Sequence, residues 1–443
     1  MAGSNVAKKL TETTQVENLE KGLKPQGFQL FNTPILWFSI FAIIAITAMY
    51  TGHLPGGMIG SLLIMIVLGE LFGWIGDRTP IINSFLGGGA IVAIFGSAFM
   101  VYSNLLPEST VTMVTDFMKT GGFLDFYIAA LITGSILGMN SKILVQAGAR
   151  YLLPLLAGVV GAGVLAGLIG LLIGYSPKEA ILVIAMPIMG GGMGAGAVPM
   201  SQVYSSMLGN EPSYYLSILV PALALGNVFA IILASLLNKL GEMKPNLSGN
   251  GQLMKNFHYE KEATTKYDIG KMGAGILAAA AFFVLGELLG AFIPLHPYAL
   301  MILMVALVKI LNLIPSAVSE GASQWYQFVA KNWTFALLIG IGIAYTDLDQ
   351  VISALSIQYV VIVFAVVLGA VIGSGIVGKM MGFYPIEAAI TAGLCMANMG
   401  GTGDVAVLSA AKRMELMPFA QISSRLGGAL ILLLVGILIP LLV

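Results

Sequence analysis

The sequence predicts an all-α polytopic membrane protein with eleven transmembrane helices, built as two inverted five-helix repeats that each carry a re-entrant hairpin. Three observations support this prediction. The composition is 58% hydrophobic and 9% charged with a mean hydropathy of +0.93, whereas a soluble globular domain is about 25% charged. Apolar segments of membrane length recur along the chain. Two glycine-rich sequences also occur at matching places in its two halves.

Charge and cysteine content exclude several classes of protein. The formal net charge is zero, with 21 basic and 21 acidic residues, so no basic field indicates a nucleic-acid partner. The single cysteine excludes an intrachain disulfide, and His53, His258 and His296 lack the spacing of metal ligands. We therefore expect no structural or catalytic metal site and no catalytic residue.

The order of the predicted elements follows from the apolar segments. Residues 1–30 are polar and lack a signal-peptide core, so we interpret them as a cytoplasmic tail. A span needs about 20 mostly apolar residues. The predicted spans are 33–50, 56–74, 87–102, 123–141, 152–174, 214–238, 271–293, 297–314, 332–348, 358–377 and 417–441.

The domain boundaries come from the same pattern. The first span, within 31–54, is additional to the repeats. Residues 55–238 form the first repeat and 271–443 the second. The hydrophilic segment 239–270 between them is interpreted as a cytoplasmic linker.

The positions of lysine and arginine predict the orientation. With the amino terminus inside, most of the 21 basic residues fall on the cytoplasmic side, where they are normally enriched. Lys119 and Lys178 remain outside, and Lys309 and Arg425 lie within spans. We therefore expect a cytoplasmic amino terminus and an external carboxyl terminus.

An internal repeat is visible in the sequence itself. "GYSPKEA" at 174–180 recurs as "GFYPIEA" at 382–388, and "GGMG" at 191–194 has a counterpart in "GGTG" at 400–403. Five spans per half is an odd number, so the two halves enter the membrane in opposite directions. Inverted repeats are typical of secondary transporters, whose binding sites form near the midplane at broken helices.

The two glycine-rich segments, 178–203 and 385–413, are each predicted to form a re-entrant hairpin. Pro187 and the glycines interrupt the first, and helix breaks at membrane depth survive only against protein or a wet cavity. Glycines that merely permit close helix packing are an alternative. A nucleotide-binding loop is a weaker alternative, since "GMGAGA" lacks the preceding strand that such a loop requires.

Arg425 and three polar residues are the candidate ligand contacts. An arginine inside a span suggests a function, and the planar guanidinium group of Arg425 fits a carboxylate. The alternative is that its side chain snorkels to the membrane interface. We expect snorkelling for Lys309 as well. Asn398 and Thr402 offer neutral oxygens to a monovalent cation or a substrate hydroxyl. Asp404 is a cation ligand, a proton carrier or a helix cap.

On these motifs the chain resembles the 2-hydroxycarboxylate transporter family. The resemblance covers nearly the whole chain and is most specific in "CMANMGGTGDVAVL" and "AQISSRLGGALIL". It implies a bacterial inner-membrane carrier of citrate or malate, a homodimer in the lipid bilayer, and an elevator-type mechanism. The implied substrate contacts are Gly192, Met193, Gly194, Asn398, Gly400, Gly401, Thr402, Ser424 and Arg425. The implied sodium ligands are Ile188, Gly191, Cys395, Asn398 and Ser424.

One position departs from the family pattern, and several functional alternatives stay open. Met193 stands where the citrate symporters tend to have Asn, which brings malate or an exchange of hydroxy acids into consideration. Sodium is the expected coupling ion and the proton its alternative. Functions of other classes are the membrane subunit of a sodium-pumping decarboxylase and a passive anion channel.

Overall fold

In this computed structural model, the described residues are 28–80, 82, 88–138, 141–254, 267–293 and 297–442. The predicted tail, apart from its last three residues, and part of the predicted linker lie outside them. The chain divides into two compact units, 1–54 and 55–443, which are described separately.

The first unit is a short hairpin followed by a helix. Strand β1 (Gln29–Leu30) pairs antiparallel with β2 (Thr33–Pro34), and Phe31 and Asn32 make the turn with positive φ values of 51° and 53°. Two central residues with positive φ suit the right-handed twist of a tight hairpin. Helix α2 (Ile35–Tyr50) follows directly and exposes many large apolar side chains, as expected of a helix in lipid.

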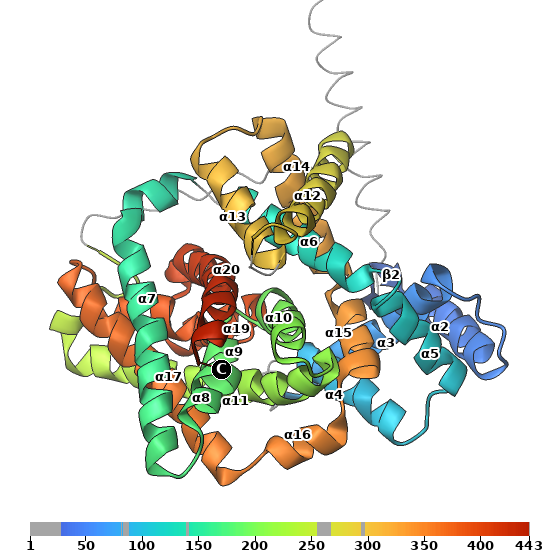
Figure 1. The fold of residues 1–443 in the computed structure, drawn as a ribbon, viewed down its shortest axis with the longest axis horizontal. Coiled ribbons are helices and arrows are strands. Elements are labelled where there is room, and N and C mark those ends of the chain that lie inside the picture. The colour runs from blue at the N-terminus through green and yellow to red at the C-terminus, as the bar shows by residue number, and fades with distance from the viewer. Residues whose placement is uncertain are drawn as a thin grey trace, which may run out of the picture. The chain divides into compact units, whose positions relative to one another are not determined.

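The second unit is helical throughout its described residues apart from connections (Figure 1). Its first half contains α3 (Met58–Arg78), α4 (Gly89–Tyr102), α5 (Glu108–Met118), α6 (Phe123–Leu137), α7 (Ser141–Leu172), α8 (Pro177–Glu179), η2 (Ala180–Ala185), α9 (Met186–Ile188), η3 (Met193–Ala197), α10 (Val198–Leu208), α11 (Pro212–Met243) and η4 (Pro245–Leu247). Its second half contains α12 (Ile269–Gly290), α13 (Pro297–Ile310), α14 (Ser316–Asn332), α15 (Thr334–Tyr345), α16 (Leu348–Ala354), α17 (Ile357–Met380), α18 (Pro385–Ala388), η5 (Ala389–Leu394), α19 (Gly401–Ala410), η6 (Met414–Leu416) and α20 (Met417–Leu442).

The helices confirm a polytopic membrane protein but do not fix the number of spans. In the described residues six helices are long and apolar enough to cross a membrane, or eight if each of two bent pairs counts as one span. Each of the eleven predicted ranges contains a helix, yet several of these helices are too short for that test. Eleven spans therefore stay a prediction.

The order of elements is similar in the two halves. Each has a bent pair of helices, α5 with α6 at 41° and α14 with α15 at 60°. A long helix follows in each half, α7 or α17, and then a segment broken at glycines and a final long helix, α11 or α20. The second half also has the short helix α16 between α15 and α17, and the inverted repeat stays a prediction.

Two groups of helices frame α20. Helix α7 packs along α17 through close glycine contacts, since a Cβ at Gly369 would lie 3.0 Å from the Cα of Ala162. Helices α6, α12, α13 and α14 form the other group (Figure 1). Helix α20 contacts both the broken segments and the second group, through α6 and α13. A site on α20 can therefore receive side chains from both sides.

A buried ion pair fixes the base of the second broken segment. The Nε of Arg413 lies 2.9 Å from Oε1 of Glu387, and these side chains are 3% and 0% exposed. Arg413 also donates to Ser248 Oγ at 2.9 Å and to Asn238 Oδ1 at 2.6 Å. The start of the predicted linker is thus packed against the protein instead of being free in solvent.

Candidate functional site

The glycine tips of the two broken segments meet each other. Gly191, Gly192 and Gly400 have φ values of +75°, +112° and +82°, which L side chains rarely adopt. A Cβ at Gly192 would lie 2.8 Å from the backbone nitrogen of Gly400, and one at Gly191 would collide with the carbonyl oxygen of Ser424. Glycine is therefore required both for the backbone turn and for the close approach.

Helices begin at both tips. The first continues from Met193 through η3 and α10, and the second begins at Gly401 in α19. The amino ends of helices carry backbone N–H donors and a partial positive charge, which favour an anion. The meeting of two such ends creates a place suited to negative charge.

A cavity of about 260 Å³ lies beside these tips. Its walls come from α6, α13, α14, α15, both glycine tips, α19 and α20. The lining residues are Tyr127, Leu131, Ile132, Ser135, Ile136, Gly191, Gly192, Met193, Ile302, Tyr326, Ala330, Thr334, Met399, Gly400, Asp404, Gln421, Ser424, Arg425, Ala429 and Leu432. Arg425 and Asp404 are the charged residues among these described lining residues.

The cavity brings together much of the predicted substrate site. Gly192, Met193, Gly400, Ser424 and Arg425 all line it. Met193 is 5% exposed and presents an apolar side chain to the wall. Five predicted contacts from three distant parts of the sequence therefore face one space.

The other predicted substrate residues lie close behind this wall. Asn398 is 1% exposed and does not line the cavity. Gly194 lies in η3 and Gly401 begins α19. The side chain of Thr402 is outside the described part of the chain, so its substrate contact stays a prediction.

Arg425 projects from α20 toward an aromatic ring. Its guanidinium carbon lies over the ring of Tyr326, 5.0 Å from the ring centroid, within the range of a cation–π interaction. A cation–π contact uses none of the guanidinium N–H groups, so they remain for hydrogen bonds. Arg425 can therefore bind a carboxylate while it keeps its contact with Tyr326.

A cluster of oxygen atoms lies next to the cavity around Ser424. Its Oγ is 2.9 Å from the carbonyl oxygen of Cys395, 2.9 and 2.8 Å from the two carboxylate oxygens of Asp404, and 3.1 Å from the carbonyl oxygen of Ala420. A serine hydroxyl has one proton and can donate to one acceptor at a time. The oxygen atoms that do not receive this proton therefore favour a bound cation.

Asn398 completes this oxygen cluster. Its Nδ2 donates to Asp404 Oδ1 at 3.0 Å, and its Oδ1 accepts from the backbone nitrogen of Gly400 at 2.7 Å. Asn398 and Asp404 are each 1% exposed. Carbonyl, hydroxyl and carboxylate oxygens at an unwound helix end are the kind of ligands that coordinate sodium in transporters.

The cap interpretation of Asp404 is wrong. The residue at the N-cap of α19 is Gly400, which has no side-chain cap, and Asp404 lies in the first turn of the helix. Its carboxylate bonds to Asn398 and Ser424 instead. A carboxylate in the first turn is still favourable to the helix dipole.

The predicted sodium ligands are only partly assembled. Cys395 and Ser424 share the oxygen cluster with Asn398, and the backbone of Gly191 lies against that of Ser424. The side chain of Ile188 instead packs toward α11, where a Cβ at Gly226 would lie 3.1 Å from its Cγ2. A role for Ile188 stays a prediction.

Several polar residues of the cavity were not anticipated from the sequence. The hydroxyl of Thr334 donates to the carbonyl oxygen of Ala330 at 2.6 Å, so the hydroxyl of Tyr127 donates to Thr334 Oγ1 at 2.7 Å. Ser135 and Gln421 also line the cavity. In the sequence they resemble other polar residues of apolar or amphipathic stretches, and only spatial proximity distinguishes them.

Asn227 of α11 also went unnoticed. Its Oδ1 accepts from the backbone nitrogen of Met399 at 3.4 Å, next to the second glycine tip. Asn227 is 1% exposed. It therefore helps to hold the unwound backbone from which the oxygen cluster is built.

Lys309 bonds to the end of a helix, and its snorkelling to the interface stays a prediction. Its Nζ donates to the carbonyl oxygen of Leu137 at 2.6 Å, and Ser319 Oγ donates to the same oxygen at 3.2 Å. Leu137 ends α6, where backbone carbonyls lack partners within the helix. Lys309 therefore caps a helix that lines the cavity.

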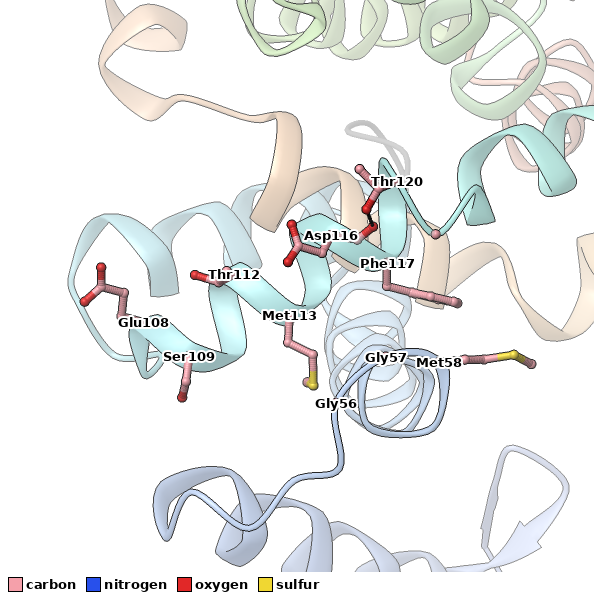
Figure 2. A pocket seen from close by; sticks show the side chains of 11 residues that line it. Gly56, Gly57, Met58, Glu108, Ser109, Thr112, Met113, Asp116, Phe117 and Thr120 are labelled. Atoms are coloured by element: carbon pink, nitrogen blue, oxygen red, sulfur yellow. Dashed lines mark hydrogen bonds between the residues drawn. The ribbon is translucent and has the colours of Figure 1, made fainter.

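A second, more open hollow of about 880 Å³ lies over α5 and the start of α3 (Figure 2). It contains none of the predicted site residues. Its charged lining residues are Glu108 and Asp116, whose carboxylates are seen along α5 in Figure 2. Two exposed acidic side chains repel an anion, so this hollow is unsuited to an organic acid.

Comparison with known proteins decides the family. The sequence model of the 2-hydroxycarboxylate transporter family matches residues 30–437. The chain belongs to this family. Its members are transporters and not enzymes, so the chain is a multi-pass membrane transport protein for this class of compound.

Individual relatives cover almost the whole chain. A protein named Na(+)-malate symporter from Bacillus subtilis is 44% identical over 423 residues, which is 94% of each chain. A citrate/sodium symporter from Salmonella dublin is 36% identical and covers 98% of this chain and 100% of its own. The malate transporter MleP of Lactococcus lactis is 39% identical, with 95% and 99% covered.

Proposed function

We propose that the protein is a sodium-coupled symporter that carries malate, a 2-hydroxydicarboxylate, across the bacterial inner membrane. The observation that carries this proposal is the cavity in which Arg425 and two helix ends lie beside the oxygen cluster of Asp404 and Ser424. One side of the site suits an anion and the other a cation. A site of this kind couples the binding of the two because each charge stabilises the other.

Charge balance supports cation coupling. Arg425 and Asp404 cancel each other, so a malate dianion in the cavity leaves two uncompensated negative charges. Charges in a low-dielectric interior are very costly unless they are paired. Two sodium ions would neutralise the loaded site, and we expect a sodium dependence of uptake with a Hill coefficient above one.

Malate is preferred to citrate for two reasons. Met193 places an apolar side chain in the cavity wall, where the citrate symporters tend to have Asn, so a hydrogen-bonding group suited to a third carboxylate is lost. The relative that shares 44% identity is also named for malate and sodium. Citrate, proton coupling and exchange of hydroxy acids remain alternatives for the test.

The transport mechanism is proposed to be alternating access in an inverted repeat. The parallel element order of 58–243 and 269–442 supports duplication, and the charge distribution supports a cytoplasmic amino terminus and an external carboxyl terminus. The two broken segments would enter from opposite faces as re-entrant hairpins. Movement of α7, α17 and the hairpins relative to the other helices would be of the elevator type, in a homodimer.

Proteoliposomes containing the purified protein test the proposed function. Labelled malate should accumulate above its equilibrium level under an inward sodium gradient and not when choline replaces sodium at constant pH. Accumulation driven by a pH gradient alone would indicate proton coupling. Flux without cation dependence or saturation would indicate a channel.

A purified chain that moves no hydroxy acid under any cation gradient would overturn the proposal and favour the decarboxylase subunit. Competition by unlabelled di- and tricarboxylates then ranks the substrates. The hairpins are tested separately by Met193→Cys and Gly401→Cys, since Met193 lines the cavity and already carries a side chain. The hairpins would be contradicted if these thiols reacted with no aqueous reagent from either face and were protected by no substrate. The native Cys395 is fully buried and gives little background reaction.

A further inference from the structure

Tyr326 lines the same cavity as the glycine tips but comes from a different helix. It belongs to α14, an amphipathic helix that packs with α6 and α12, whereas Arg425 belongs to α20. Its ring lines the cavity under the guanidinium of Arg425. The contact therefore joins α20 to the group of α6, α12, α13 and α14 at the predicted anion site.

The backbone of α6 makes room for Tyr326. A Cβ at Gly134 would collide with the Cβ of Tyr326 and with the carbonyl oxygen of Ala322. At Gly138, one turn further, a Cβ would meet the side chain of Ser323. The absence of side chains at both glycines lets α14 approach α6 closely and sets the position of the Tyr326 ring.

We propose that Tyr326 is a positioning residue that holds the guanidinium plane of Arg425 so that its free edge faces the substrate carboxylate. This inference rests on the proposed function. A guanidinium already held against a ring loses less freedom when a carboxylate binds than a free one does. The aromatic face also compensates part of the positive charge before substrate arrives.

The interaction depends on the aromatic face and not on the hydroxyl. Tyr326→Phe keeps the face, and Tyr326→Leu removes it while retaining an apolar side chain. A cation–π contact contributes a factor of about two- to thirtyfold in affinity. We expect Tyr326→Leu to raise the KM for malate by such a factor with Vmax nearly unchanged, and Tyr326→Phe to behave like the unmodified protein.

Phe328→Leu is the matched control. Phe328 lies on the same helix, is 37% exposed and stacks on Trp325 with ring centroids 5.6 Å apart. It does not line the cavity. This substitution removes an aromatic ring from α14 without touching Arg425, and the KM for malate should not change.

The measurement is initial uptake of labelled malate into proteoliposomes at saturating sodium, with KM and Vmax determined for all four proteins. An unchanged KM in Tyr326→Leu, or an equal rise in Tyr326→Phe and Tyr326→Leu, would overturn the proposal. If Tyr326→Leu does not assemble, Tyr326→Met provides a second measurement, since it removes the aromatic face but keeps a long apolar side chain and should raise KM in the same way.

Failure of the proposed function gives a different result. In that case the unmodified protein shows no sodium-driven malate uptake, and the Tyr326 variants are compared for protection of a Met193→Cys thiol by the hydroxy acids. If the unmodified protein transports malate normally and Tyr326→Leu shares its KM, only the positioning role is rejected.

Discussion

Replacement of Asp404 by Asn tests the cation side of the site directly. Both carboxylate oxygens approach Ser424 Oγ, at 2.9 and 2.8 Å, and one accepts from Asn398 Nδ2 at 3.0 Å. The amide keeps one oxygen, replaces the other by a donor and removes the negative charge. A contact to a charged group contributes about 1.5–3 kcal/mol, which corresponds to roughly a 10- to 150-fold change in affinity.

We therefore expect the half-saturating sodium concentration for malate uptake to rise by about 10- to 150-fold in Asp404→Asn. The assay is initial uptake in proteoliposomes over a range of sodium concentrations, at fixed ionic strength and saturating malate. Asp116→Asn on α5 is the control, because that exposed carboxylate lies in the separate hollow of Figure 2. An unaltered sodium dependence in Asp404→Asn would refute the assignment of the oxygen cluster.

Four further substitutions probe other parts of the molecule. Arg425→Lys replaces the planar guanidinium group by a point charge and should raise the KM for malate by about tenfold or more. Uptake kinetics equal to those of the unmodified protein would show that Arg425 does not bind the substrate. Met193→Asn should make citrate a better competitor of malate uptake, and an unaltered competition profile would show that position 193 does not select the substrate. Gly192→Ala should abolish uptake while the protein still reaches the membrane, because its Cβ would lie 2.8 Å from the nitrogen of Gly400; normal uptake would mean that the tips can separate. Glu387→Gln leaves the buried Arg413 charge without its partner, which costs about 3–5 kcal/mol, so the melting temperature in detergent should fall, and an unchanged value would contradict the role given to this pair.

The sequence alone determined the class of protein and the positions of its two critical turns. Hydropathy is a local property, and each predicted apolar range overlaps a helix of the described chain. The glycine clusters and Arg425 also stand out locally, because loosened backbone and a charge are both costly in a membrane. Residue type therefore singled out the glycine clusters and Arg425, and the resemblance to the family supplied the five predicted substrate contacts that line the cavity.

The tertiary structure decided which residues act together. Three contacts show this: Gly192 with Gly400, Asp404 with Ser424, and Tyr326 with Arg425. They join segments that are far apart in the chain, or side chains whose direction depends on a helix break. Local patterns carry no information on such contacts, because the same tyrosine or aspartate would fit a surface position or a helix cap equally well. Only the packing of α20 between the glycine tips and α14 separates these possibilities.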